Sequence, residues 1–152
     1  MSFKASTGFI NSVLATGSVK ALLDTMFFQV YSGAVPTSAD AASTGTAAVL
    51  WTIKDGTDVL TWALNTSVSP PVLEKASTDT WSGATAAGTA TYFRILRTDD
   101  TEGSSTSLPR LQGEVGATLS TATDLYVSST TFTPGTKTLA SFSVWRSMPC
   151  SR

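Results

Sequence analysis

The residue types that carry most enzyme chemistry near neutral pH are scarce in this sequence. Histidine is absent, the single cysteine is Cys150, and 14% of the residues are charged. Histidine is the usual general base near neutral pH. No serine stands three residues before a lysine, as the Ser-x-x-Lys pattern of some hydrolases requires. We therefore expect a protein that is not an enzyme, with no catalytic, metal-binding or cofactor-binding residues.

The carboxylates that cluster along the chain are the remaining candidates for chemistry. Asp99, Asp100 and Glu102 share one polar stretch, and Asp55 and Asp58 share another. Such groups can catalyse glycoside hydrolysis or bind calcium, but neither cluster has the alternating spacing of a dedicated calcium loop. Aspartate is also common in turns, because its side chain hydrogen-bonds to nearby backbone. We interpret both clusters as solvated turn residues, and a hydrolase working through them is the less favoured alternative.

Aromatic side chains are a second kind of candidate, because they can stack on sugars or anchor a subunit contact. Alternation along the surrounding strands places Trp51 and Trp62 on inward faces. Trp81 and Trp145 lie in small-residue or terminal stretches, so we expect them to be exposed or interfacial. With the apolar anchors near the N-terminus added, the interface candidates are Phe3, Phe9, Ile10, Trp81 and Trp145.

Short strands are expected to position these residues. Apolar residues alternate with polar ones, or fill both faces, in segments such as 26–31, 59–64 and 89–97. Residues that favour turns (Gly, Pro, Asp and Ser) separate the segments. Seven to nine such strands predict an all-β fold, an antiparallel β-sandwich or jelly roll. The segment 26–31 is apolar on both faces, which indicates a strand that is central or covered on both sides.

The N-terminal region differs from the rest of the chain. Residues 1–17 contain isolated apolar anchors and are predicted to form an extended arm, whereas residues 18–152 are predicted to form a single β-sandwich domain. One short helix is expected over residues 19–24, where Ser18 can serve as the N-cap. A helix of about two turns is stable only when its apolar face docks on a larger body.

Length and charge limit the class of partner. A chain of 152 residues favours one domain with a substantial core. The formal net charge is -1 and the basic residues are scattered, so we expect no nucleic-acid partner. No apolar run approaches the roughly 20 residues of a membrane span. The N-terminus lacks the layout of a secretion signal. We therefore expect synthesis in a cytoplasm, no membrane partner and no intramolecular disulfide at Cys150.

Three parts of the sequence carry an ordered set of short motifs. They are Val30-Tyr31-Ser32-Gly33-Ala34-Val35-Pro36 with Ala39-Asp40-Ala41-Ala42 and Gly45-Thr46, then Trp81-Ser82-Gly83 with Gly88-Thr89-Ala90-Thr91-Tyr92-Phe93-Arg94, and last Asp124-Leu125-Tyr126-Val127-Ser128-Ser129-Thr130. As a set they resemble small virion structural proteins of tailed bacteriophages, over most of residues 18–145. The resemblance implies a head decoration, or cementing, protein. It also suggests tight backbone turns at Gly33, Gly83 and Gly88, and an acidic loop partner for Arg94.

A decoration protein of this type is expected to be a non-enzymatic part of the virion. It would be made in the host cytoplasm, lie on the capsid surface, bind the major capsid protein and associate with copies of itself as a dimer or trimer. The arm would reach neighbouring subunits, so deletion of residues 2–14 is expected to weaken attachment and leave the fold intact. The alternative is a tail or fibre accessory module that binds carbohydrate, through exposed aromatic side chains, or another tail protein.

Overall fold

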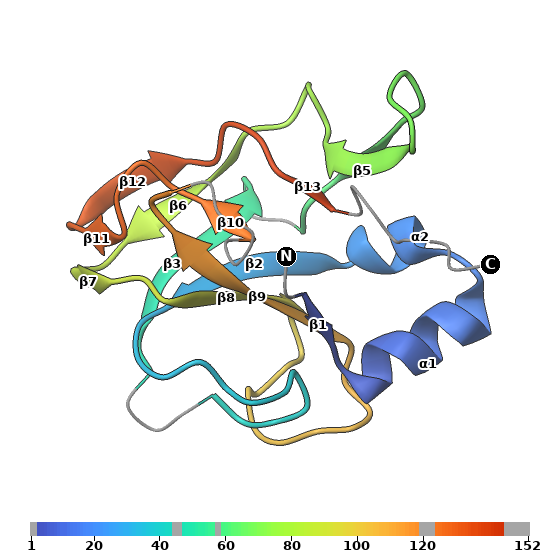
Figure 1. Ribbon diagram of the computed structural model, residues 1–152, viewed down its shortest axis with the longest axis horizontal. Helices are drawn as coiled ribbons and strands as arrows, with labels where there is room; N and C mark the ends of the chain where they lie inside the picture. The colour runs from blue at the N-terminus through green and yellow to red at the C-terminus, as the bar shows by residue number, and fades with distance from the viewer. Residues whose placement is uncertain (1–2, 44–46, 57–58, 119–123, 145–152) are drawn as a thin grey trace.

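Strands make up most of the regular secondary structure, as the alternating sequence pattern predicts. The computed structural model describes residues 3–43, 47–56, 59–118 and 124–144 (Figure 1). The two helices are α1 (Thr7–Thr16) and α2 (Val19–Leu23). The strands are β1 (Lys4–Ala5), β2 (Met26–Tyr31), β3 (Val49–Asp55), β4 (Trp62–Asn65), β5 (Val72–Lys75), β6 (Trp81–Thr85), β7 (Gly88–Thr89), β8 (Tyr92–Arg97), β9 (Arg110–Gly116), β10 (Leu125–Tyr126), β11 (Thr131–Phe132), β12 (Gly135–Thr138) and β13 (Ser143–Val144). The predicted all-β class, with a short helix near the N-terminus, is confirmed.

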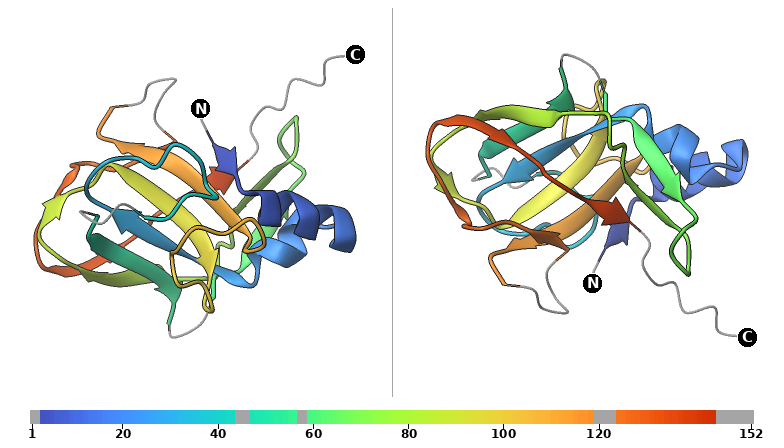
Figure 2. Two further views of the ribbon diagram at one scale, coloured as in Figure 1. Left: turned by 90° about the horizontal axis from the view of Figure 1, so that it is seen from below. Right: turned by 90° about the horizontal axis from the view of Figure 1, so that it is seen from above.

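One eight-stranded sheet, called here the main sheet, contains most of the strands. Its order is β1-β9-β8-β2-β3-β6-β12, and β10 pairs with β9 in parallel, whereas the other pairings are antiparallel. A three-stranded sheet, β13-β5-β4, and a two-stranded ribbon, β11-β7, complete a sandwich-like arrangement. The helices lie at one end of the main sheet, and β5 and β13 lie over one of its sides (Figures 1 and 2).

The hydrophobic core contains a group of aromatic rings centred on Phe28 of β2. The Phe28 ring centroid lies 4.9 Å from that of Phe93 and 4.8 Å from that of Phe142. The Trp81 ring centroid lies 6.5 Å from it. Phe28 and Phe93 come from adjacent strands, whereas Phe142 comes from the segment leading into β13. Because successive side chains of a strand point to opposite faces, every second residue of β2 and β8 enters this core.

The opposite face of the main sheet is also buried, which confirms that β2 is covered on both sides. Phe27 is 7% exposed and Tyr31 is 1% exposed, although both point away from Phe28. The connections 32–43 and 98–109 cover this side of the sheet (Figure 1), and backbone hydrogen bonds join them to each other. This covered face contains charged and amide side chains as well as aromatic ones.

The extended arm suggested for residues 1–17 is replaced over α1 by a ten-residue helix. Ser6 caps this helix, because its hydroxyl accepts a hydrogen bond of 3.0 Å from the backbone N–H of Phe9. Gly17 ends it in the left-handed conformation, with φ of 71°. Phe9 is buried in the hydrophobic core, and Val13, one turn later, packs against that core. The segment therefore docks through a helical repeat of apolar residues rather than through separate anchors.

The helix predicted over residues 19–24 is confirmed as α2. The Ser18 hydroxyl accepts a hydrogen bond of 3.1 Å from the backbone N–H of Ala21, and Leu22 and Leu23 are buried in the core. Among the described residues, neither helix is long and apolar enough to cross a membrane.

Candidate functional site

The structure separates the predicted interface residues into buried and exposed ones. Trp81 is 0% exposed and Phe9 is 3% exposed. Phe3 is partly buried, and its ring packs edge-on against rings of the core. Ile10, by contrast, is 50% exposed. Trp145 lies outside the described residues. Of the four candidates that the structure describes, Ile10 is the one whose side chain is classed as exposed.

The expectation of an exposed or interfacial Trp81 is wrong. Trp81 begins β6, and β6 is paired with β3 on one side and with β12 on the other. Its ring meets that of Trp62 edge to face, with centroids 4.8 Å apart. The small residues that follow Trp81 belong to a paired strand rather than to an open loop, so the indole points into the core.

The three glycines expected at tight turns behave differently from one another. Gly33 has φ of 89°, the left-handed conformation that favours glycine. Gly83 stands within β6, where a Cβ would lie 1.8 Å from the carbonyl oxygen of Thr52. Gly88 stands in β7. The turn predicted at Gly83 is therefore wrong, and glycine is needed there because two strands approach closely.

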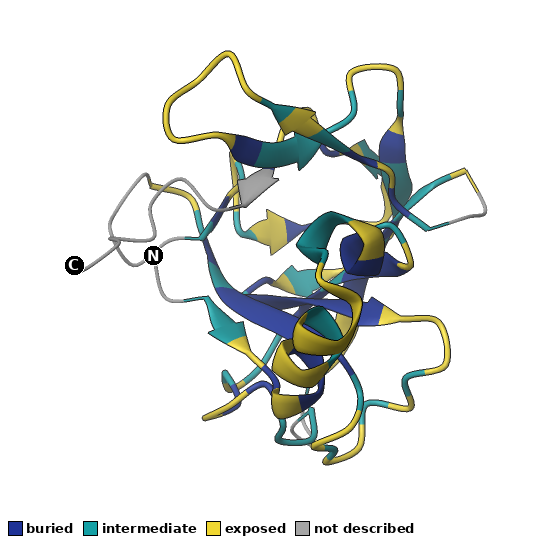
Figure 3. Cartoon of the chain, turned by 90° about the vertical axis from the view of Figure 1, so that its right-hand side faces the viewer, coloured by how far each residue is buried: buried dark blue, intermediate teal, exposed yellow. Residues whose placement is uncertain are grey.

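One apolar helix surface is left uncovered. Helix α1 exposes Ile10 at 50% and Leu14 at 78%, and these two residues lie one turn apart on the same side of the helix. None of the ten residues of α1 is charged. The outer side of α1 is largely exposed in Figure 3. We call Ile10 and Leu14 the α1 face, which is a candidate contact surface because it is apolar and uncharged.

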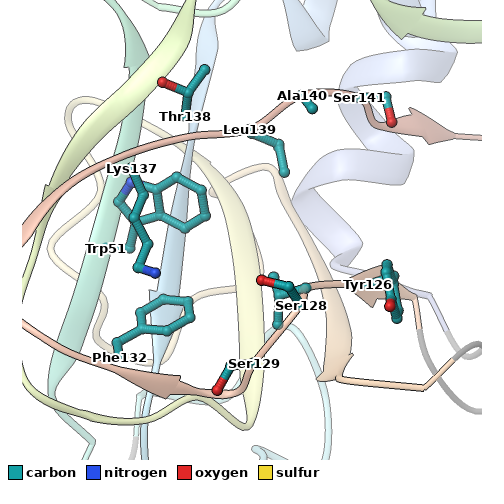
Figure 4. A pocket seen from close by; sticks show the side chains of 11 residues that line it. Trp51, Tyr126, Ser128, Ser129, Phe132, Lys137, Thr138, Leu139, Ala140 and Ser141 are labelled. Carbon is teal, nitrogen blue, oxygen red and sulfur yellow. The ribbon is translucent and has the colours of Figure 1, made fainter.

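A pocket of about 360 Å³ opens beside β12 (Figure 4). It lies between the segments 126–132 and 137–141, and Trp51 of β3 contributes to it from the main sheet. Trp51 and Phe132, which are 3% and 2% exposed, form an apolar floor, with their rings edge to face and their centroids 5.8 Å apart. Tyr126, at 51% exposure, stands at the rim.

Among the described residues that line this pocket, Lys137 is the one that is charged. Its ammonium nitrogen lies 5.4 Å from the centroid of the Phe132 ring, a cation–π distance. The three ion pairs found among the described residues do not include Lys137. The pocket therefore carries a positive charge that no carboxylate of the described chain neutralises.

Hydroxyl side chains make up much of the remaining lining. They belong to Ser128, Ser129 and Ser141, whereas Thr138, next to Lys137 on β12, points its hydroxyl away from Lys137 (Figure 4). The Ser129 hydroxyl is engaged in a local turn, where it accepts a backbone N–H at 3.2 Å. The Ser128 hydroxyl points toward the side of the pocket that holds Lys137 (Figure 4). Ring surface, hydroxyls and a single cation together are suited to binding a small polar ligand.

The sequence pattern does not predict this pocket, although strand alternation correctly places Trp51 on an inward face. The lining comes from residues 126–141 and from Trp51, which is far away in the sequence. The available signal was the hydroxyl-rich stretch 128–131 followed by an isolated lysine, Lys137. That pattern is common in loops and does not identify a binding site without the tertiary contact.

A buried polar cluster occupies the covered face of the main sheet. The Nε of Arg94, on β8, donates to the side-chain oxygen of Gln112 at 3.0 Å, and an Nη donates to the carbonyl of Ala41 at 2.8 Å. Gln112 donates in turn to the carbonyl of Pro36 at 2.8 Å. The acidic partner expected for Arg94 is therefore replaced by amide and carbonyl oxygens. These bonds attach the connection 32–43 to the sheet.

Arg110 is the buried arginine that pairs with an acidic loop residue. Its guanidinium donates to both oxygens of Asp100, at 2.5 and 2.6 Å, and both side chains are 1% exposed. Asp100 also accepts a hydrogen bond of 2.7 Å from the backbone N–H of Glu102. The interpretation of Asp100 as a solvated turn residue is therefore wrong, because bidentate pairing offsets its desolvation. In the described residues, no group of three acidic, cysteine or histidine side chains is placed to hold a metal ion.

Two stacked tyrosines lie on the same covered face. The rings of Tyr31 and Tyr92 have centroids 4.8 Å apart and planes 6° apart. The Tyr31 hydroxyl donates to the side-chain oxygen of Gln29 at 2.7 Å. Burial, followed by the nearby negative charge of Glu102, raises the pKa of Tyr31 well above its usual value. Burial also raises the pKa of Tyr92.

These raised pKa values predict a loss of stability at alkaline pH. Tyrosine in the unfolded chain ionises near pH ~10, whereas the two buried hydroxyls keep their protons to higher pH in the folded state. Above that pH the unfolded state binds fewer protons, so stability is full below about pH 10 and then falls by up to about 1.4 kcal/mol per pH unit for each tyrosine. Urea unfolding between roughly pH 9 and pH 11 measures this slope. Tyr31→Phe should make it shallower, and an unchanged slope would contradict the explanation.

Comparisons with protein-family models, with curated proteins and with solved structures found no match to this chain.

Proposed function

We propose that this chain is a non-enzymatic structural protein of a tailed-phage virion that decorates the capsid by binding neighbouring subunits of the major capsid protein. The observation that carries the proposal is the α1 face, where Ile10 and Leu14 stand exposed on an uncharged helix. The resemblance over residues 18–145 supports it independently. Association with further copies of the chain, as a dimer or trimer, is part of the proposal.

The α1 face is fixed to the body of the protein. The buried Ser6 hydroxyl donates to the carbonyl of Leu108 at 2.9 Å and accepts the backbone N–H of Arg110 at 2.8 Å. Thr7, the first residue of the helix, donates its N–H and its hydroxyl to the carboxylate of Asp40, at 2.9 and 2.7 Å. A contact surface held in this way loses little conformational freedom on binding, which favours association.

The energy available from the α1 face is modest for a single copy. Full burial of an isoleucine or leucine side chain contributes about 1.5–3 kcal/mol. Half or more of Ile10 and Leu14 is still exposed, so their burial together would contribute about 2–4 kcal/mol. An oligomer that binds several lattice positions at once adds such contacts together, and avidity then exceeds the affinity of any one contact.

The proposal predicts that Ile10→Ser combined with Leu14→Ser weakens capsid binding by about 30-fold or more per contact, from the burial energy lost. Heads produced from the genome that encodes the chain, with its own gene deleted, are incubated with purified protein and sedimented. Bound protein is quantified against the capsid protein by mass spectrometry. The unfolding midpoint of each variant is measured first, and we expect it to stay close to that of the wild type.

The matched control is Leu64→Ser combined with Val68→Ser, which replaces two other exposed apolar side chains at 58% and 43% exposure. This control should bind heads as the wild type does. Equal occupancy for both double variants would exclude the α1 face as the contact. Absence of the chain from purified heads would overturn the proposal itself. Deletion of residues 2–14 is a poor test, because Phe9 is a core residue and β1 pairs with β9.

A carbohydrate-binding accessory module of the tail or fibre is the second candidate, and the pocket favours it. The pocket combines an aromatic floor at Trp51 and Phe132 with an exposed ring at Tyr126 and several hydroxyls. Ligand sites of this size usually combine apolar surface with a few polar groups. Binding of the purified chain to a glycan array, measured beside the head-binding assay, distinguishes the two candidates.

A further inference from the structure

We infer that the pocket between segments 126–132 and 137–141 binds a saccharide unit that carries a carboxylate, with the carboxylate on Lys137. This inference rests on the second candidate function, carbohydrate binding, and adds the chemical class of the ligand. It does not depend on attachment to a capsid.

The size of the pocket limits the ligand to a small unit. Its volume of about 360 Å³ lies at the lower end of the range of roughly 300–1,000 Å³ for small-molecule sites. One sugar ring, or one ring with part of a neighbour, matches such a space. Trp51 and Phe132 lie beneath the pocket and are 3% and 2% exposed, so the C–H groups of a ligand meet only a small part of their rings. Tyr126, exposed at the rim, can cover a ring that enters the pocket.

The charge of the pocket selects an anionic ligand. Lys137 supplies the ammonium group, and the other described residues that line the pocket are uncharged. The ammonium is held near the ring of Phe132, so its direction is set before a ligand arrives. A carboxylate placed against it would form a charge-assisted hydrogen bond, which is about twice as strong as a neutral one. The part of the lining that the structure describes holds no carboxylate to repel such a ligand.

The hydroxyl side chains favour a polyhydroxylated ligand over a simple carboxylic acid. Ser128 and Ser141 supply a hydroxyl-bearing residue to each of the two walls of the pocket. A hydroxyl group can donate one hydrogen bond and accept two, as the hydroxyls of a sugar ring also can. An aliphatic acid of the same size would leave these partners without hydrogen bonds from the ligand, so we expect it to bind more weakly.

The test is an NMR titration of the uniformly ¹⁵N-labelled protein with D-galacturonate, D-glucuronate and N-acetylneuraminate. The neutral sugar D-galactose and the acid acetate are titrated separately. At least one acidic sugar should shift the backbone amides of 126–132 and 137–141 and the indole N–H of Trp51. We expect its dissociation constant to be about tenfold lower than that of galactose, the ratio for one hydrogen bond to a charged group. It should also be lower than that of acetate, which keeps the carboxylate but lacks the ring hydroxyls.

Lys137→Met is the decisive variant, because methionine keeps the apolar length of the side chain and removes the charge. It should raise the dissociation constant of the acidic sugar to that of galactose. Lys54→Met is the matched control: Lys54 also lies over a ring, 5.1 Å from the centroid of Phe27, but it does not line the pocket. The control should leave binding unchanged.

The possible outcomes distinguish failure of the inference from failure of the carbohydrate-binding function on which it rests. If galactose binds in the pocket as tightly as the acidic sugars, carbohydrate binding stands and the assignment of the carboxylate to Lys137 is wrong. If none of the sugars shifts the pocket amides, both the inference and the carbohydrate function fail. An acidic sugar that binds Lys137→Met as tightly as the wild type also overturns the inference.

Discussion

Replacement of Arg110 by methionine is expected to lower the free energy of unfolding by about 3–5 kcal/mol, the range for breaking a buried ion pair from one side. The variant leaves the Asp100 carboxylate, 1% exposed in the wild type, without its guanidinium partner. The hydrogen bond from the backbone N–H of Glu102 remains but cannot neutralise the charge. Urea unfolding of the purified variant, followed by fluorescence and circular dichroism, measures the loss.

The matched control is Arg97→Met, which makes the same chemical change on the same sheet. Arg97 pairs with Asp99 at 3.0 Å, but these side chains are 46% and 54% exposed. Exposed pairs of this kind contribute up to about 1 kcal/mol. If the two variants lost equal amounts of unfolding free energy, the assignment of a dominant stabilising role to Arg110 would be contradicted. Combining Arg110→Met with Asp100→Leu should recover part of the stability, since the unpaired buried charge is then removed.

Replacement of Trp81 by alanine is expected to destabilise the protein by about 3–5 kcal/mol, through lost burial and the cavity that remains. The indole is 0% exposed, and its ring packs against those of Phe28 and Trp62. Trp81→Phe should be much milder, because it keeps ring volume. It also removes an indole N–H that has no hydrogen-bond partner in the described structure.

Ile10→Ala serves as the comparison for Trp81, since both residues are interface candidates on sequence grounds. Ile10 is 50% exposed, and a surface change of this kind usually alters stability by less than about 0.5 kcal/mol. Thermal and urea unfolding of the two variants test the assignments together. If Trp81→Ala unfolded at the same midpoint as the wild type, Trp81 would belong to the surface and its role as an interface residue would be open again.

The features that could be predicted from the sequence depend on local periodicity and on turn chemistry. Segment 26–31, apolar on both faces, is β2 and is buried on both sides. Trp51 and Trp62, placed inward by alternation, are 3% and 1% exposed. The serine cap and the apolar residues of α2 were sufficient to locate that helix. Each of these features involves residues within a few positions of one another, so the pattern carries the structural information directly.

Other features had a local signal that was outweighed by a competing one. Ser6 and Gly17 are a cap and a terminator for α1, and Phe9 and Val13 have helical spacing. The scattered apolar residues nevertheless suggested an extended arm. At Trp81, the small residues that follow it suggested an open loop, although they lie in β6, paired on both sides. In both cases the sequence permits two local conformations, and packing against the main sheet decides which of them forms.

The all-β class, the short α2 helix and the inward tryptophans follow from the residue pattern, because side-chain alternation is a property of each strand alone. Long-range pairing decides the rest. Arg94 and Arg110 are buried because the connections 32–43 and 98–109 cover their side of the sheet. Likewise, Lys137 and Trp51 line the same pocket only because β12 pairs with β6, which is the neighbour of β3 in the main sheet. Strand alternation specifies which side chains share a face, but it does not specify what covers that face.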